Sequence, residues 1–125
     1  MQKCFTACLS LLIWGCYSVE RNCLPFHEGQ FQFTTMVNGA MQTATFSRKG
    51  NLEIERFQGQ IDSANIRWVN DCECILTKIN PTSNQDKRPI RMRIIQTQDS
   101  SSYIFEYALV GDNKNTQRGT IQKIK

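Results

Sequence analysis

The feature that most constrains this chain is an alternation of apolar and polar side chains with a period of two, which runs from Gly29 onward and is interrupted by short turns. Successive side chains of a strand point to opposite faces, so this period predicts half-buried β-strands. Asn38-Gly39 is the strongest hairpin signal, because both central positions of a type I′ turn need a positive φ. The pattern predicts eight strands, at about 29–37, 40–47, 52–58, 60–69, 72–80, 90–98, 103–110 and 116–124.

Sequential antiparallel strands with short connections favour an up-and-down meander, and closing such a sheet removes its exposed edges. The predicted fold is therefore all-β: one small antiparallel meander over residues 29–125, closed or nearly closed into a lipocalin-like barrel. A barrel of this strand number is just wide enough to be filled by side chains or to hold one small ligand. A two-sheet β-sandwich is the alternative. With 125 residues, the chain has room for one such domain.

The first fifteen residues have the pattern of a targeting segment. Met1-Gln2-Lys3 gives a positive start, and Cys4 to Gly15 is uncharged and mostly apolar. This run is shorter than the about 20 apolar residues that span a bilayer, and it has the length of the apolar region of a secretory signal. A buried N-terminal helix is the alternative, although the run has neither a polar face nor a capping residue. We predict a signal peptide over 1–15 and therefore export.

Ile13 to Cys16 resembles a bacterial lipobox, in which an invariant cysteine thiol takes the lipid that holds the protein to a membrane. Lipidation at Cys16 would leave residues 16–28 as a tether before the barrel. No Asp follows Cys16 directly, which favours the outer membrane, with the protein facing the periplasm. Ordinary cleavage after Ser18 is the alternative and would give a soluble periplasmic or secreted protein.

Three cysteines lie beyond the predicted cleavage point: Cys23, Cys72 and Cys74. Export implies an oxidising compartment, and bridging Cys23 to Cys72 would stabilise the protein by about 4 kcal/mol in the chain-entropy model, and by less if the bridge is strained. Cys23–Cys74 is the alternative bridge. A zinc or copper(I) site made by the three cysteines and His27 is a further alternative, although one C-x-C pair is weak support for it. We therefore predict the disulfide Cys23–Cys72 and no metal.

The sequence contains little that indicates catalysis. It has one histidine and no Gly-rich phosphate loop, which argues against Ser-His-Asp or Cys-His chemistry and against nucleotide binding. Glu53 and Glu55 are expected to point outward into solvent rather than to form an acid–base pair. The net charge of +4 is spread along the chain without a basic stripe, so nucleic-acid binding is not expected. We predict a protein that is not an enzyme and has no cofactor.

Candidate ligand-binding residues lie on three of the predicted strands. An aromatic stripe with a period of two could stack on a ligand, but this spacing indicates a core in the first place. Two arginines on another strand could hold an anion inside the barrel or could face water. The candidates are Trp68, Arg91, Arg93, Tyr103, Phe105 and Tyr107.

Several motifs give the chain a family resemblance: Arg21-Asn22-Cys23, Phe26, Gly29 to Phe33, Ile66 to Glu73, Phe105-Glu106-Tyr107, Val110-Gly111-Asp112 and Gln117 to Thr120. With these motifs the chain resembles short exported bacterial proteins and lipoproteins of unknown function, often labelled DNA topoisomerase IV. A topoisomerase needs an ATP-binding or cleavage domain far longer than this chain, so we interpret the label as a misannotation. The resemblance implies export, a disulfide and one β domain. Members usually carry an aromatic residue where this chain has Cys74, which favours Cys23–Cys72 as the bridge.

The sequence therefore predicts a non-catalytic cell-envelope lipoprotein whose small barrel binds a partner protein or a small apolar ligand. A structural or interaction module with a filled core is the first alternative, and it would carry an exposed apolar patch. A thiol or metal-binding protein using Cys23, Cys72 and Cys74 is the second. A carrier requires a cavity of several hundred cubic ångströms, on the order of known ligand pockets.

Overall fold

The computed structural model describes residues 19–125. The predicted signal peptide over 1–15, the predicted lipidation at Cys16 and the alternative cleavage after Ser18 lie outside the described residues. A single turn of 3-10 helix, η1, precedes eight strands, β1 to β8. Their bounds are η1 Leu24–Phe26, β1 Gly29–Val37, β2 Ala40–Lys49, β3 Leu52–Phe57, β4 Gln60–Asn70, β5 Glu73–Lys78, β6 Ile90–Gln98, β7 Ser102–Leu109 and β8 Gln117–Lys123.

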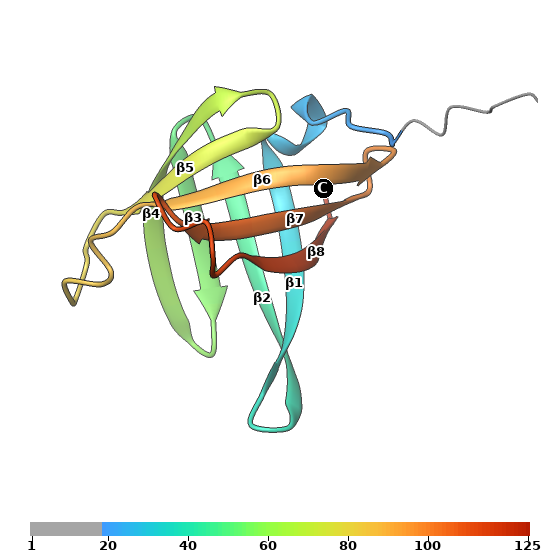
Figure 1. The fold of residues 1–125 in the computed structure, drawn as a ribbon. Coiled ribbons are helices and arrows are strands. Elements are labelled where there is room, and N and C mark those ends of the chain that lie inside the picture. Colours follow the sequence, from blue (N-terminus) through green and yellow to red (C-terminus); the bar gives the residue numbers. More distant parts are fainter. Residues whose placement is uncertain (1–18) are drawn as a thin grey trace, which may run out of the picture.

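The strands form one closed antiparallel barrel in which each strand pairs with the next and β8 returns to β1 (Figure 1). The predicted all-β meander is therefore confirmed, and each strand lies within two residues of its expected bounds. The barrel has two ends, which we name by their connections. The closed end carries η1 and the turns after β2, β4 and β6. The open end carries the turns after β1 and β3 and the loops after β5 and β7.

Two hairpins at the open end are fixed by two-residue turns of positive φ. Asn38 and Gly39 have φ of 51° and 78°, which confirms the predicted turn, and the strands pair fully up to Val37 and Ala40. Gln58 and Gly59 repeat this geometry with φ of 49° and 77°. The first hairpin extends well beyond the rest of the barrel (Figure 1). Primed turns twist in the same sense as the strands they join, which allows this long extension.

The seam that closes the barrel is short. β1 and β8 pair through Phe31 with Lys123 and through Gln32 with Gln122, and the two glutamine side chains share a hydrogen bond of 3.1 Å. Further along β8, a Cβ at Gly119 would come within 2.9 Å of two phenylalanine rings. Glycine at this position therefore lets aromatic rings from β1 and β7 cover the inside of the seam.

The segment that precedes β1 fills the closed end of the barrel. Phe26 of η1 is fully buried, and its ring centroid lies 4.9 Å from that of Tyr103 and 6.5 Å from that of Phe31. The backbone nitrogen of Asn22 donates to the hydroxyl of Thr97 at 2.9 Å. These contacts attach the segment to β1, β6 and β7, and η1 lies across this end of the barrel (Figure 1).

This packing corrects the predicted tether over residues 16–28 from Cys23 onward, while residues 16–18 lie outside the described part of the chain. Cys23 and Phe26 belong to the hydrophobic core, with 2% and 0% of their surfaces exposed. The folded domain therefore includes residues upstream of Gly29. The physical reason is that an eight-stranded barrel left open at both ends would expose its aromatic interior, and Phe26 covers that interior at one end.

Candidate functional site

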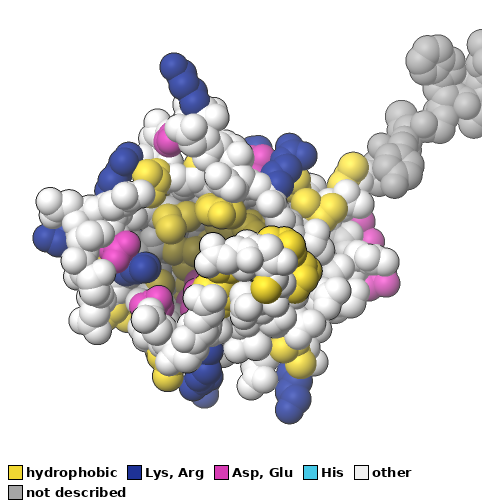
Figure 2. Space-filling model, turned by 90° about the horizontal axis from the view of Figure 1, so that it is seen from below, with side chains coloured by type: hydrophobic (Ala, Val, Ile, Leu, Met, Phe, Trp, Pro, Cys, Tyr) yellow, Lys and Arg dark blue, Asp and Glu magenta, His cyan; other side chains and the backbone are white. Residues whose placement is uncertain are grey.

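The interior of the barrel contains a cavity of about 260 Å³ that opens to solvent at the open end. Seen from that end, hydrophobic side chains line a hollow beside the protruding hairpin, with charged side chains at its edge (Figure 2). Most of the wall is apolar, and four of the lining residues are aromatic. The lining residues are Phe33, Ala44, Phe46, Arg48, Glu53, Glu55, Leu76, Ile90, Met92, Phe105, Tyr107 and Ile121.

A buried ion pair forms the inner end of this cavity. The side chain of Arg48, 2% exposed, donates from Nε to the carboxylate of Glu53 at 2.8 Å. Its Nη1 donates to the backbone carbonyl of Phe26 at 3.1 Å. The pairing is local, because Arg48 and Glu53 are direct partners in the β2–β3 register. The same arginine therefore satisfies a carboxylate on the barrel wall and a carbonyl of the segment that closes the barrel.

Aromatic rings surround the guanidinium of Arg48. Its Cζ lies 5.0 Å from the ring centroid of Phe31, 4.9 Å from Phe46, 5.7 Å from Trp68 and 5.8 Å from Tyr103. Each distance is within the range of a cation–π interaction, which is strongest where water is excluded. Burial alone would lower the pKa of Arg48, but the negative charges that Tyr103 and Glu53 carry when they are ionised outweigh it, and the pKa is raised. Arg48 is therefore a permanent buried cation.

Two buried polar atoms beside this cluster have no hydrogen-bond partner among the described residues: Trp68 Nε1 and the hydroxyl of Tyr103. Burial raises the pKa of Tyr103 to about 12, so the hydroxyl stays protonated at neutral pH. Neither residue lines the cavity. The two groups therefore add to the desolvation cost of the core, which the packing around them offsets.

The structure corrects the predicted orientation of Glu53 and Glu55. Both side chains line the cavity, and only Glu55 also keeps the solvent exposure that was predicted for it. Leu52, which precedes Glu53 and lies on the opposite face of β3, is 38% exposed. The register shows why: Glu53 pairs with Arg48 and Glu55 pairs with Phe46, and both partners face the interior. The buried cation of β2 therefore determines which face of β3 is turned inward.

A second cavity of about 320 Å³ adjoins the first at the open end and shares Glu53, Glu55, Leu76 and Ile90 with it. It is more polar, because charged side chains of β4 and β5 and of the loop after β5 contribute to its wall. The remaining lining residues are Asp62, Ser63, Ala64, Lys78, Gln85, Asp86, Arg88 and Leu109.

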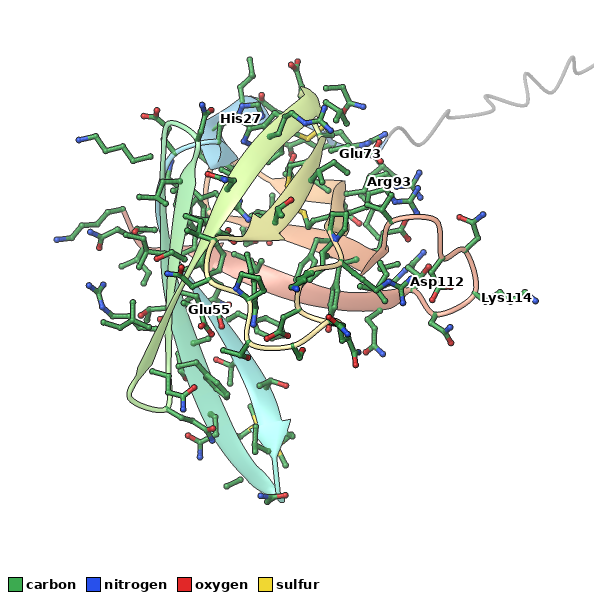
Figure 3. The ribbon with its side chains drawn as sticks, turned by 90° about the vertical axis from the view of Figure 1, so that its left-hand side faces the viewer. His27, Glu55, Glu73, Arg93, Asp112 and Lys114 are labelled. Atoms are coloured by element: carbon green, nitrogen blue, oxygen red, sulfur yellow. A yellow bond between two sulfur atoms is a disulfide. The ribbon has the colours of Figure 1, made fainter. Side chains whose placement is uncertain are left out.

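Glu55 is one of the two carboxylates that line both cavities, and unlike Glu53 it has no salt bridge within residues 19–125. Its direct partner across β3 and β4 is Asp62, another carboxylate. Burial raises the pKa of Glu55, and repulsion from Glu53 and Asp62 adds to the effect, while Lys78 opposes it. Figure 3 places Glu55 away from His27, which lies near η1 at the closed end.

Four of the six predicted ligand-binding residues point into the barrel. Tyr103 and Phe105 are core residues, 1% and 6% exposed, and Trp68 packs against the core. Phe105 and Tyr107 line the cavity, with stacked rings whose centroids are 5.6 Å apart. The aromatic stripe of β7 therefore contributes to the core at the closed end and to the cavity wall at the open end.

The other two predicted residues, Arg91 and Arg93, lie on the outer face of β6. Arg91 is 3.7 Å from the carboxylate of Glu73, and Arg93 is paired with the carboxylate of Glu106. Figure 3 shows Glu73 and Arg93 close together at the outer surface. Because Met92 and Ile94 take the inward positions, neither arginine contributes to the cavity. The cation of the interior is Arg48, which the prediction did not include.

The predicted disulfide Cys23–Cys72 is confirmed, with a Cα–Cα distance of 5.2 Å, and Cys74 is a buried free thiol. The bridge uses two of the thiols that the alternative metal site would need. Within residues 19–125, no three His, Cys, Asp or Glu side chains are grouped so as to hold a metal ion. Burial raises the pKa of Cys74 to about 12, which disfavours the thiolate that metal binding and thiol chemistry require.

The position of Arg48 was implicit in the sequence. Ala44, Phe46 and Arg48 are spaced two apart on one strand, so an inward Phe46 also places Arg48 inward. The predicted strand over 40–47 ended one residue before Arg48, so Arg48 was not assigned to the inner face. The period of two through Ala44 and Phe46 already indicated an inward Arg48, but a charged residue was not expected in the core.

None of the helices in residues 19–125 is long and apolar enough to cross a membrane. Comparisons of the chain with protein-family models, with curated proteins and with solved structures found no match.

Proposed function

We propose that this protein is a non-catalytic binding protein of the cell envelope, and that its barrel takes up a small apolar ligand through the open end. The observation that carries the proposal is the cavity of about 260 Å³, which has mostly apolar walls and one accessible end. Its size is close to that of known ligand pockets, which begin at about 300 Å³. Because the segment before β1 fills the closed end with Phe26, the cavity is a pocket with one opening rather than a channel.

An envelope location is supported by the disulfide Cys23–Cys72, since such bonds persist in oxidising compartments. The signal peptide over 1–15 and the lipid anchor at Cys16 remain part of this proposal. In the proposed arrangement the anchor holds the barrel at the outer membrane, where ligands of low solubility partition. The disulfide fastens the segment over residues 19–28, which closes the barrel, and the proposed anchor precedes this segment in the chain.

The chemistry of the cavity supports binding rather than catalysis. Its deepest polar groups, Arg48 and Glu53, are already paired with each other. His27 lies at the closed end, where its ring stacks on Trp68 at 3.8 Å and its Nε2 is 2.7 Å from the carbonyl of Asp71. A general acid or base must reach the reacting group, and this histidine is outside the cavity.

The proposal is tested by filling the cavity. Ala44 is 6% exposed and lines the wall, so Ala44→Phe places a ring in the cavity. We expect the full chain to enhance and blue-shift the fluorescence of phenylnaphthylamine, a neutral apolar fluorophore, and Ala44→Phe to weaken this binding at least about tenfold. Titration with the fluorophore measures the effect, and urea unfolding shows whether the variant is folded.

Ala40→Phe is the matched control, because Ala40 lies on the same strand in the exposed part of the hairpin. It adds the same ring outside the cavity and should leave the affinity unchanged. Equal affinity in the wild type and in folded Ala44→Phe would contradict the proposal. Binding would then have to occur elsewhere, and the partner-protein alternative would be favoured, with the exposed Met36 and Met41 of the hairpin as its apolar patch.

A further inference from the structure

The charges around the cavities point to the chemical class of the ligand, an inference that rests on the proposed function. The walls of the two adjoining cavities carry four carboxylates and three cationic side chains, in a chain whose net charge is +4. The interior is therefore more acidic than the rest of the molecule. A charge of this sign inside a mostly apolar cavity favours a positively charged ligand group.

The carboxylates differ in whether they have a partner. Glu53 is paired with Arg48 at 2.8 Å, and Asp86 is 3.7 Å from Lys78. Neither Glu55 nor Asp62 has a cation within 4.0 Å among the described residues. These two are direct cross-strand partners, and like charges placed opposite each other are destabilising. A cation between them would remove this repulsion.

Aromatic rings stand beside the unpaired carboxylates. Phe46 is the cross-strand partner of Glu55 on β2, and both line the cavity. Phe33, Phe105 and Tyr107 complete the aromatic wall, and the rings of Phe33 and Phe105 meet edge to face with centroids 5.9 Å apart. Aromatic faces attract organic ammonium ions, most strongly where water is excluded. A carboxylate beside such rings suits an ammonium group attached to an apolar body.

The same geometry argues against an anionic ligand and against a bare metal ion. Arg48 is the only cation that lines the apolar cavity within residues 19–125, and its Nε and Nη1 already donate to Glu53 and to the carbonyl of Phe26. An anion there would stand next to the carboxylate of Glu53. In the described part of the chain, no set of three or more ligating side chains could replace the water shell of a metal ion.

We propose that the ligand is an apolar amine, with its hydrocarbon body in the cavity of about 260 Å³ and its ammonium group between Glu55 and Asp62 at the mouth. Lys78 and Arg88 at the edge of the second cavity limit the number of positive charges that fit, which favours a single ammonium group over a polyamine.

The test uses three probes of equal chain length: octylammonium, octanol and octanoate. Isothermal titration calorimetry on the full chain should give the tightest binding for octylammonium, then octanol, then octanoate. Glu55→Gln keeps the shape of the side chain and removes its charge, so we expect it to weaken octylammonium about tenfold and to leave octanol unchanged. Glu20→Gln is the matched control, because Glu20 is exposed at the closed end.

The outcomes separate this inference from the proposed function. If octanol and octanoate bind as tightly as octylammonium, or if Glu55→Gln weakens the binding of all three probes equally, the proposal of an amine ligand is contradicted. The proposed binding of an apolar ligand would still stand. If none of the probes binds and phenylnaphthylamine does not bind either, the proposed function fails and the inference fails with it. If octanoate binds most tightly, the proposal is contradicted, because the ligand would then be an anion recognised by Arg48.

Discussion

At the closed end of the barrel, the guanidinium of Arg48 has a carboxylate and a carbonyl as partners and four aromatic rings around it. At the open end, Glu55 faces another carboxylate, and no cation within residues 19–125 pairs with either. The closed end is also connected to the N-terminal segment through a disulfide and the buried ring of Phe26. The difference indicates that the closed end stabilises the barrel, while the open end keeps polar groups unpaired at the cost of stability, as binding sites often do.

The largest expected effect is on the closed end. Arg48→Met fills a similar volume but leaves the carboxylate of Glu53 and the carbonyl of Phe26 without their donor. Breaking a buried ion pair by removing one partner costs about 3–5 kcal/mol, so urea unfolding should show a loss of about 4 kcal/mol. Lys49→Ala, the exposed neighbour on the opposite face, is the control and should change stability by less than about 0.5 kcal/mol.

A double variant sharpens this prediction. Arg48→Met combined with Glu53→Met removes both charges, and the paired replacement should recover much of the loss. If the single and double variants unfold at the same urea concentration, the desolvated carboxylate is not the cause. The cation–π contacts with the rings of Phe31 and Phe46 would then be the dominant contribution of Arg48.

The next largest loss of stability is expected when the segment over residues 19–28, which closes the barrel, loses its disulfide. Replacing both Cys23 and Cys72 by Ala removes a bridge across a sequence separation of 49, and such losses are typically about 3 kcal/mol. Either single replacement should cost about the same, because each breaks the bridge. Urea unfolding gives the loss, and intact mass before and after reduction should show that the wild type gains two hydrogens. A loss below about 1 kcal/mol would mean that the packing of the buried Phe26 is sufficient to keep residues 19–28 in place without the bridge.

The smallest expected effect is a gain in stability rather than a loss, and it concerns the open end. Because burial and neighbouring carboxylates raise the pKa of Glu55, the folded protein binds this proton more tightly than the unfolded chain does. Its contribution to stability is therefore present below the ordinary pKa of 4.5 and is lost as pH rises through the raised value. Glu55→Gln removes this penalty and should stabilise the protein by about 0.5 kcal/mol at neutral pH, the range of one like-charge pair.

Measurement of unfolding against pH checks the sign. The advantage of Glu55→Gln should disappear below pH 4.5. It should also decrease in high salt, because the side chain of Glu55 is only partly desolvated at the cavity wall and remains accessible to solvent that screens its interactions. Glu20→Gln should show no such advantage at any pH. If Glu55→Gln destabilises the protein at neutral pH, Lys78 is a real partner of Glu55 and the open end is better paired than we infer.

The inward-facing residues were predicted correctly on strands where the apolar side chains occupy the inner face. On β1 and β7 the alternating aromatic residues turn inward, and the predicted core and cavity residues Phe105 and Tyr107 are found there. On β3 the apolar and acidic residues alternate equally well, and the rule that apolar residues face inward selected the wrong face. Leu52 is 38% exposed, because the ion pair of Glu53 with Arg48 offsets the cost of turning carboxylates inward.

The sequence by itself determined the strands, their order and their hairpins, because a period of two and turns such as Asn38-Gly39 are local properties of the chain. It also indicated the bridge Cys23–Cys72. Only the tertiary structure decided that Phe26 closes one end, that Arg48 is the interior cation and that Glu55 faces Asp62 at the mouth. These features depend on which residues meet across the closed barrel. Burial of a charge is favourable only when its partners are in place, and for Arg48 these include the carbonyl of Phe26 and rings from other strands as well as the nearby Glu53.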